Sequence, residues 1–162
     1  MRLLLATLAA VLVAAAPAAA KTIDVVDTIG AKMPSAQRAD LPVLVPAKMN
    51  LDYDGKVYAT SSTRRGEYGI SLAATARCGG NACFLAHLSA DRGQSLGVKR
   101  NVRLANGIRG AYVPLSCGAS CSPPSIQLIQ KGVRYEIQAK ALGGKKAFVA
   151  MANCAIRAGN RG

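Results

Sequence analysis

The chain has 162 residues and a formal net charge of +13 at pH 7, with 21 Lys and Arg against eight Asp and Glu. This length favours a single domain, and a hydrophobic fraction of 51% excludes a disordered chain. There is no tryptophan and there are only two phenylalanines, so we expect a thin aliphatic core that benefits from covalent reinforcement.

The first 20 residues are typical of an export signal. Met1-Arg2 is a short positive region, an apolar run extends from Leu3 to Ala16, and Ala18-Ala19-Ala20 is a small-residue cleavage site. Cleavage there predicts a mature protein that begins at Lys21 and resides in the periplasm or outside the cell. The alternative is an uncleaved membrane anchor. No later apolar run approaches the roughly 18 to 20 residues that span a bilayer, so we predict no transmembrane segment after cleavage.

Residues 21–40 mix Asp, Gly, Pro and Ser with little periodicity, and we interpret them as an N-terminal arm before a β-rich domain at 41–162. The run LPVLVP follows, and its flanking prolines predict an edge strand or an extended pass along the surface at Leu41 to Val45. KVYATSS and EYGISLAAT flank the turn Arg64-Arg65-Gly66. The alternating apolar positions 68, 70, 72 and 74 predict a first β-hairpin there.

A second hairpin is predicted in NVRLANGIRGAYVPL, because Asn106-Gly107 suits a two-residue type I′ turn. This loop pairs Val102 with Ala111. One face is then mostly apolar, comprising Val102, Leu104, Ala111, Val113 and Leu115. The opposite face is polar, comprising Lys99, Asn101, Arg103 and Tyr112. Arg100 and Arg109 fall on the apolar side in this register, where only its rim would accept them.

A third hairpin is predicted in SIQLIQKGVRYEIQAKA, with Lys131-Gly132 as its loop. Its apolar face comprises Ile126, Leu128, Val133, Tyr135, Ile137 and Ala139. Its polar face comprises Gln127, Arg134, Glu136, Gln138 and Lys140. Two hairpins with one apolar and one polar face each indicate an antiparallel sheet that is solvated on one side.

The apolar face of such a sheet needs a cover, and residues 145–158 are the candidate. Apolar residues recur there at helical spacing between Gly143-Gly144 and Gly159, although AFVAMA is also compatible with a strand. The predicted fold class is mainly β within α+β. We expect an antiparallel meander of six or seven strands, curved or partly closed, with one C-terminal helix.

The five cysteines include two close pairs, in CGGNAC and CGASCSPP, which both fall at expected corners of the sheet. A four-thiolate zinc site is conceivable, but such sites usually present C-x2-C, whereas these spacings are C-x4-C and C-x3-C. A redox centre would also prefer C-x2-C, at a helix N-terminus. Export favours structural disulfides, and we predict Cys78–Cys83 and Cys117–Cys121. Cys154 is then a buried free thiol.

His87 is the only histidine, and on a strand it shares a face with Ser89 and Asp91. Residues two apart on a strand lie roughly 7 Å from each other, too far for a proton relay, so we interpret this row as a solvated face. The sequence contains no phosphate-binding glycine loop and no zinc-protease motif. We therefore predict no catalytic, cofactor-binding or metal-binding residue and expect a protein that is not an enzyme.

The positive charge is concentrated in the body of the domain. From Gly55 onward 16 basic residues face only three acidic ones. Such a field attracts polyanions, namely phosphorylated or carboxylated polymers of the cell envelope, anionic lipid headgroups or nucleic acid, although solubility is an equally simple explanation. The predicted anion-binding residues on the polar sheet face and its rim are Lys99, Arg103, Arg109, Arg134 and Lys140. Nucleic acid is not the expected partner, because no binding motif is present and the compartment is wrong for it.

The motifs LPVLVP, GGNACF, LANGIRGAYVPLSCGASCSPPSIQLIQKGVRYEIQ and ANCAI, together with the tyrosine-bearing first hairpin, suggest a relationship. The stretch from Leu41 to about Arg161 resembles a family of uncharacterised exported bacterial domains. That resemblance implies an exported single domain. Because the family has no established activity, it implies no catalytic residue.

Three functional hypotheses follow. The first is a non-enzymatic envelope or secreted protein whose basic sheet face binds an anionic polymer or a partner. The second is a small hydrolase whose site is assembled from residues distant in the sequence. The third is a purely structural domain without a specific ligand.

Overall fold

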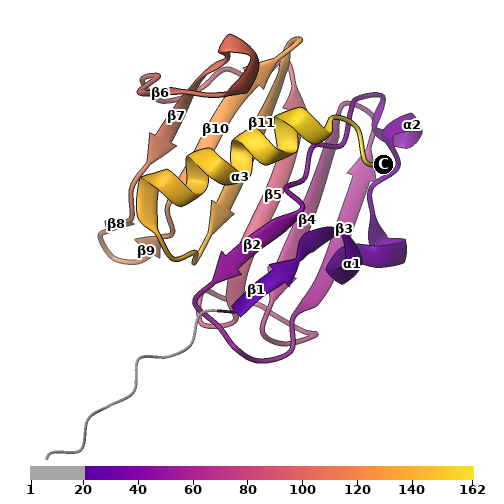
Figure 1. Cartoon of the computed structure of the whole chain (residues 1–162). Helices are drawn as coiled ribbons and strands as arrows, with labels where there is room; N and C mark the ends of the chain where they lie inside the picture. The colour runs from indigo at the N-terminus through magenta and orange to yellow at the C-terminus, as the bar shows by residue number, and fades with distance from the viewer. Residues whose placement is uncertain (1–20) are drawn as a thin grey trace, which may run out of the picture.

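The computed structural model describes residues 21–162, so the predicted export signal lies outside the described residues. Its main element is an open antiparallel sheet of seven strands, in the order β3-β4-β5-β11-β10-β7-β6 (Figure 1). A single long helix, α3 (Gly144–Ala158), lies across this sheet. The predicted fold class, a mainly β protein with an antiparallel sheet and one C-terminal helix, is confirmed.

Two runs of strands build the sheet. The first run is β3 (Tyr58–Arg64), β4 (Glu67–Ala73) and β5 (Phe84–Arg92). The chain then crosses to the far edge and returns through β6 (Val102–Arg103), β7 (Arg109–Val113), β10 (Ser125–Gln130) and β11 (Val133–Ala139). The two runs join where β11 pairs with β5. Two small sheets pair β1 (Lys21–Asp24) with β2 (Lys48–Leu51), and β8 (Ser116–Cys117) with β9 (Cys121–Ser122).

The third hairpin has the predicted loop, and the first has the predicted turn shortened to Arg65-Gly66, because Arg64 pairs with Glu67. In the third, Gln130 pairs with Val133, and the loop residues Lys131 and Gly132 have φ values of 50° and 75°. Both residues are in the left-handed region that a type I′ turn requires. The alternation of β11 is the one expected from the sequence, with Val133, Tyr135, Ile137 and Ala139 all buried.

The predicted register of the second hairpin is wrong by one residue. Val102 pairs with Gly110, not with Ala111, and the connection runs through a 3-10 turn, η2 (Ala105–Gly107). Because side chains alternate along a strand, this slip reverses both faces of β7. Tyr112 pairs with the buried Ile126 and faces the core, where its ring centroid is 5.6 Å from that of Phe148.

The remaining residues of β7 turn to the other face of the sheet. Ala111 pairs with Gln127, and Val113 pairs with Ser125. Arg109 shares the face of Ala111, so it does not lie on the apolar side as predicted. Leu115, which was expected to extend the apolar face, lies beyond β7 and is 59% exposed.

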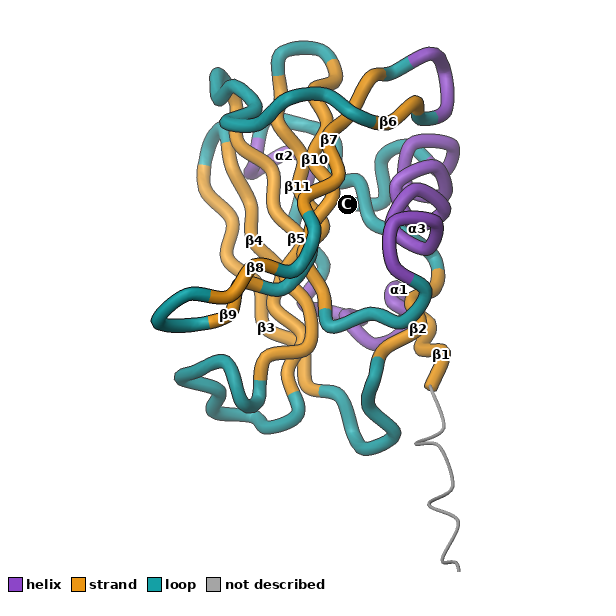
Figure 2. Tube along the Cα trace, turned by 90° about the vertical axis from the view of Figure 1, so that its left-hand side faces the viewer, coloured by secondary structure: helices purple, strands orange, loops and turns teal. Residues whose placement is uncertain are grey.

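Helix α3 covers one face of the sheet, with β1, β2 and α1 beside it on the same side (Figure 2). Its predicted apolar stripe is confirmed, since Phe148, Met151, Ala152, Ala155 and Ile156 are buried. The side chain of Asn153 accepts a hydrogen bond from the amide of Ala105 (2.6 Å), which attaches η2 to the helix. Within residues 21–162, no helix has the length and apolar character needed to cross a membrane.

Residues 21–40 are not a loose arm. They form β1, α1 (Val25–Ile29), the 3-10 turn η1 (Gly30–Lys32) and α2 (Ala36–Ala39). Ile23, Val25, Ile29 and Ala39 contribute buried side chains to the core. Periodicity did not predict these elements because each spans only three to five residues, less than is needed to display a repeat.

The proline-flanked segment LPVLVP forms no strand, and it is mostly buried rather than running along the surface as predicted. Leu41, Val43, Leu44 and Val45 are all buried. Side chains distant in the sequence satisfy its backbone: the hydroxyl of Tyr68 accepts from the Leu44 amide (3.0 Å) and donates to the Leu44 carbonyl (3.1 Å). The Tyr135 hydroxyl donates to the Pro42 carbonyl (3.2 Å). These side-chain bonds replace a strand partner in the interior.

Candidate anion-binding site

The uncovered face of the sheet, which we call the outer face, carries rows of polar side chains across paired strands. One row joins Thr60, Ser71, His87, Gln138 and Ser125. The next joins Ser62, Gly69, Ser89, Glu136 and Gln127. The sequence predicted a polar face, and the registers place it opposite α3.

The five predicted anion-binding residues do not form one patch. Arg134 lies on the outer face of β11, but its guanidinium is paired with Asp91 (3.3 Å). Lys140 follows the other end of β11, and its ammonium group donates to the Asn81 carbonyl. Lys99 is exposed in the connection between β5 and β6. Only Arg103 and Arg109 are direct neighbours.

Arg103 and Arg109 are a cross-strand pair at the free edge of the sheet, and we call them the arginine edge. They lie opposite each other on β6 and β7, and both are exposed. Neither has a carboxylate partner within 4.0 Å among residues 21–162. A hollow of about 300 Å³ opens here, lined by Asn101, Val102, Arg103 and Arg109. The two guanidinium groups therefore flank an open recess.

The structure holds this edge in place through side chains of neighbouring residues. The Asn101 side chain donates to the Tyr112 carbonyl and accepts from the Tyr112 amide, both at 2.8 Å. It thereby imitates one further backbone pair of the β6–β7 ladder. Gly110 packs beneath Leu104, and an added Cβ there would lie 2.7 Å from the Gln127 carbonyl oxygen. A side chain at position 110 would therefore clash with the backbone of β10 and with Leu104.

Acidic residues elsewhere on the molecule pair with other groups. Glu67 pairs with Arg64, Asp91 pairs with Arg134, and Asp40 lies 3.7 Å from Arg65 and 3.9 Å from Arg92. Glu136 accepts a hydrogen bond from Gln127 (3.0 Å). These four carboxylates therefore engage groups on β3, the β3–β4 turn, β5, β10 and β11, and none of them neutralises the arginine edge.

His87 is half-buried on the outer face, and its hydrogen-bond partner comes from the neighbouring strand. Its Nδ1 atom lies 3.1 Å from the hydroxyl oxygen of Ser71, across the strand pair. Burial lowers the pKa of the imidazole, and the carboxylates of Glu136 and Asp91 act in the opposite direction. In the described part of the chain, no carboxylate is hydrogen-bonded to this ring.

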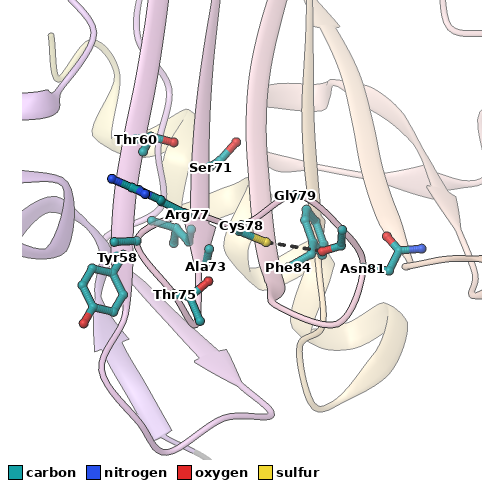
Figure 3. Close-up of a pocket in the computed structure, with 13 residues that line it drawn as sticks. Tyr58, Thr60, Ser71, Ala73, Thr75, Arg77, Cys78, Gly79, Asn81 and Phe84 are labelled. Carbon is teal, nitrogen blue, oxygen red and sulfur yellow. Dashed lines mark hydrogen bonds between the residues drawn. The ribbon is translucent and has the colours of Figure 1, made fainter.

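A second hollow, which we call the Arg77 pocket, lies over the outer face near β3 and β4 (Figure 3). Its volume is about 610 Å³. Most of its lining is neutral and polar or small, and the pocket is bounded by Tyr58, Thr60, Ser71, Leu72, Ala73, Thr75, Ala76, Arg77, Cys78, Gly79, Gly80, Asn81 and Phe84. Sequence reasoning missed this site. The sequence feature that could have indicated it is a loop with Thr75, Arg77 and Asn81 beside the predicted Cys78–Cys83 pair.

The cysteines are paired as predicted. Cys78–Cys83 closes the loop between β4 and β5, and Cys117–Cys121 closes the β8–β9 hairpin. The Asn81 side chain donates to the Cys121 carbonyl (3.2 Å), so the two disulfide loops are in contact. Cys154 is a free thiol, but it is half-buried and accepts from the Ala47 amide (3.4 Å).

The four cysteines of the conceivable zinc site, Cys78, Cys83, Cys117 and Cys121, are bonded in pairs as disulfides. Among residues 21–162, no group of three or more His, Cys, Asp or Glu side chains is placed to hold a metal ion.

Comparison with known proteins adds no relative, because no family model, no curated protein sequence and no solved structure matches this chain. The resemblance to exported bacterial domains therefore stays a prediction. The arginine edge and the Arg77 pocket have to be interpreted from their own chemistry.

Proposed function

We propose that this protein is an exported, non-enzymatic binding module that attaches to an anionic polymer of the cell envelope through the arginine edge. One observation carries the proposal: Arg103 and Arg109 face each other across β6 and β7 without a carboxylate partner in the described chain. Like charges directly opposite each other destabilise a strand pair. An anion bound between them relieves that repulsion.

The residue type agrees with this role. Guanidinium groups bind carboxylate, sulfate and phosphate groups through two parallel hydrogen bonds, and one such charge-assisted bond contributes roughly 1.5 to 3 kcal/mol. The net charge of +13 adds long-range attraction to any polyanion. Export is supported by the signal-like residues 1–20 and by the two disulfides, which persist in oxidising compartments.

The test measures binding to heparin, used as a soluble model polyanion, at rising NaCl concentration. We expect the double variant Arg103→Ala/Arg109→Ala to bind roughly tenfold more weakly, because at least one charge-assisted contact is lost. We also expect a shallower dependence of affinity on salt, since fewer counterions are displaced.

The matched control is Arg64→Ala/Arg65→Ala, which removes the same two charges from residues already paired with Glu67 and Asp40. We expect it to retain most of the affinity. Equal losses in both double variants would show that net charge alone drives binding, and binding that is insensitive to salt would refute the proposal.

A further inference from the structure

The Arg77 pocket is chemically different from the arginine edge. Arg77 is its only charged lining residue, and its guanidinium has no carboxylate partner in the described chain. In Figure 3 the Arg77 side chain extends from the disulfide loop toward β3, where Tyr58 and Thr60 line the same pocket. The pocket thus presents one unneutralised cation among neutral groups.

We propose that this pocket binds one acidic sugar unit, a hexuronate, with its carboxylate on Arg77. A guanidinium matches a carboxylate through two parallel hydrogen bonds. The hydroxyls of Thr60, Ser71 and Thr75 and the amide of Asn81 supply donors and acceptors for sugar hydroxyls. The rings of Tyr58 and Phe84 supply apolar surface for the carbon face of the sugar.

The size of the pocket fits this ligand class. Its volume of about 610 Å³ falls within the roughly 300 to 1,000 Å³ of typical small-molecule sites. A few fixed polar groups within apolar walls are what gives such sites their specificity. Here one wall comes from β3 and β4, and the other comes from the loop that Cys78–Cys83 closes.

Part of the pocket wall is held in place before a ligand arrives. The Cys83 carbonyl accepts from the Ala74 amide (2.8 Å), which closes the base of the loop, and Asn81 is anchored to Cys121. The bond between Ser71 and His87 orients the Ser71 hydroxyl. Lys56 lies over the Tyr58 ring, with its ammonium group 5.1 Å from the ring centroid. This order reduces the entropy lost on binding.

The proposal stands independently of the polymer-binding function, because the pocket belongs to β3 and β4 whereas the arginine edge belongs to β6 and β7 at the opposite edge of the sheet. The test titrates the ¹⁵N-labelled, disulfide-bonded protein with D-glucuronate, with D-glucose and with acetate, and follows the backbone amides. We expect glucuronate to shift the amides of residues 75–81 saturably. Glucose and acetate should each bind at least tenfold more weakly.

Arg77→Gln tests the carboxylate contact while keeping a polar side chain of similar reach, and we expect it to weaken glucuronate binding at least tenfold. Arg157→Gln, an exposed helix residue with the same charge change, should bind as the parent does. Arg103→Ala/Arg109→Ala should also retain glucuronate binding, so failure of the polymer proposal would leave this one intact. Unshifted loop amides, equal shifts with acetate or glucose, or an unaffected Arg77→Gln variant would each overturn it.

Discussion

His87 lies between the solvent and the interior, and its protonation affects the folded state. The half-buried ring is bonded to Ser71, and burial lowers the pKa of the imidazole below its ordinary value of 6.5. The ring is therefore neutral at pH 7 in the folded protein. The unfolded chain takes up a proton at higher pH than the folded chain does, which links this side chain to stability.

We expect the free energy of unfolding to decrease on acidification as His87 becomes protonated. A lowered folded pKa means that the stabilising contribution of the neutral ring is complete above the unfolded pKa of about 6.5 and is lost as the pH falls through the folded pKa. Urea denaturation between about pH 5 and 8 measures this dependence, and the single histidine resonance in NMR measures the pKa directly.

The control is His87→Gln, which removes the titrating group but keeps a polar side chain of similar length. Its stability should vary less with pH over the same range. A histidine midpoint above 6.5, or an identical pH dependence in the variant, would contradict the assignment.

At the scale of elements, the sequence pattern determines the loop of the third hairpin, whereas packing determines the register of the second. Lys131-Gly132 predicted the right loop because β10 and β11 alternate clearly on both sides of it. Asn106 and Gly107 have φ values of 56° and 73° in the structure, and the predicted type I′ turn also requires positive φ at both residues, so the dipeptide alone could not distinguish the two registers. Packing of Tyr112 against Phe148 and of Gly110 beneath Leu104 selects the register, and both contacts join separate elements.

The same limit applies to the candidate sites. The sequence predicted both disulfides, the polar sheet face and five basic residues, including Arg103 and Arg109. It did not predict that Arg134 would be neutralised by Asp91 while the arginine edge stayed unpaired, because this depends on the join between β5 and β11. The Arg77 pocket combines β3, β4 and a loop, and no local pattern identifies such an assembly.

The β8–β9 hairpin depends on its disulfide more than the main sheet does. All four of its strand residues are exposed, and the bond closes only a four-residue separation. We expect Cys117→Ser/Cys121→Ser to lower the free energy of unfolding by about 2 kcal/mol, the loop-closure entropy for so short a loop. Urea denaturation measures the change, and far-UV circular dichroism should show an unchanged sheet.

Cys154→Ser is the matched control, since this thiol closes no loop. Its stability should remain near that of the parent. Loss of the sheet in the double variant would mean that the fold depends on the Cys117–Cys121 bond, which would contradict this prediction.

At the scale of the whole molecule, residues 21–40 complete the core. Besides their buried side chains, they are attached by the bond from the Val25 amide to the Ala47 carbonyl (2.8 Å) and by that from the Lys32 ammonium to the Ala59 carbonyl (2.7 Å). A flexible arm would be dispensable. In this segment α1, η1 and α2 pack against β3, and β1 and α1 lie on the same side of the sheet as α3 (Figure 2).

We therefore expect deletion of residues 21–40 to prevent stable folding. The loss of several buried aliphatic side chains, each contributing roughly 1.5 to 3 kcal/mol, is comparable to the whole stability of a small domain. Circular dichroism and amide dispersion in NMR measure the outcome. A matched variant that replaces only exposed Asp27 and Arg38 with Ala should fold normally, and a folded deletion variant would restore the arm interpretation.

The buried segment around Val43 has a consequence for the order of folding. Its amide donates to the side chain of Asn160, 117 positions later, and its carbonyl accepts from the Arg161 amide. Such contacts form late, because bringing together residues so far apart in the chain is entropically slow. A nascent chain cannot close this interior until residue 161 has been synthesised. The export proposed above would benefit from this delay, because a chain that lacks residues 160 and 161 keeps this part of its interior open during translocation.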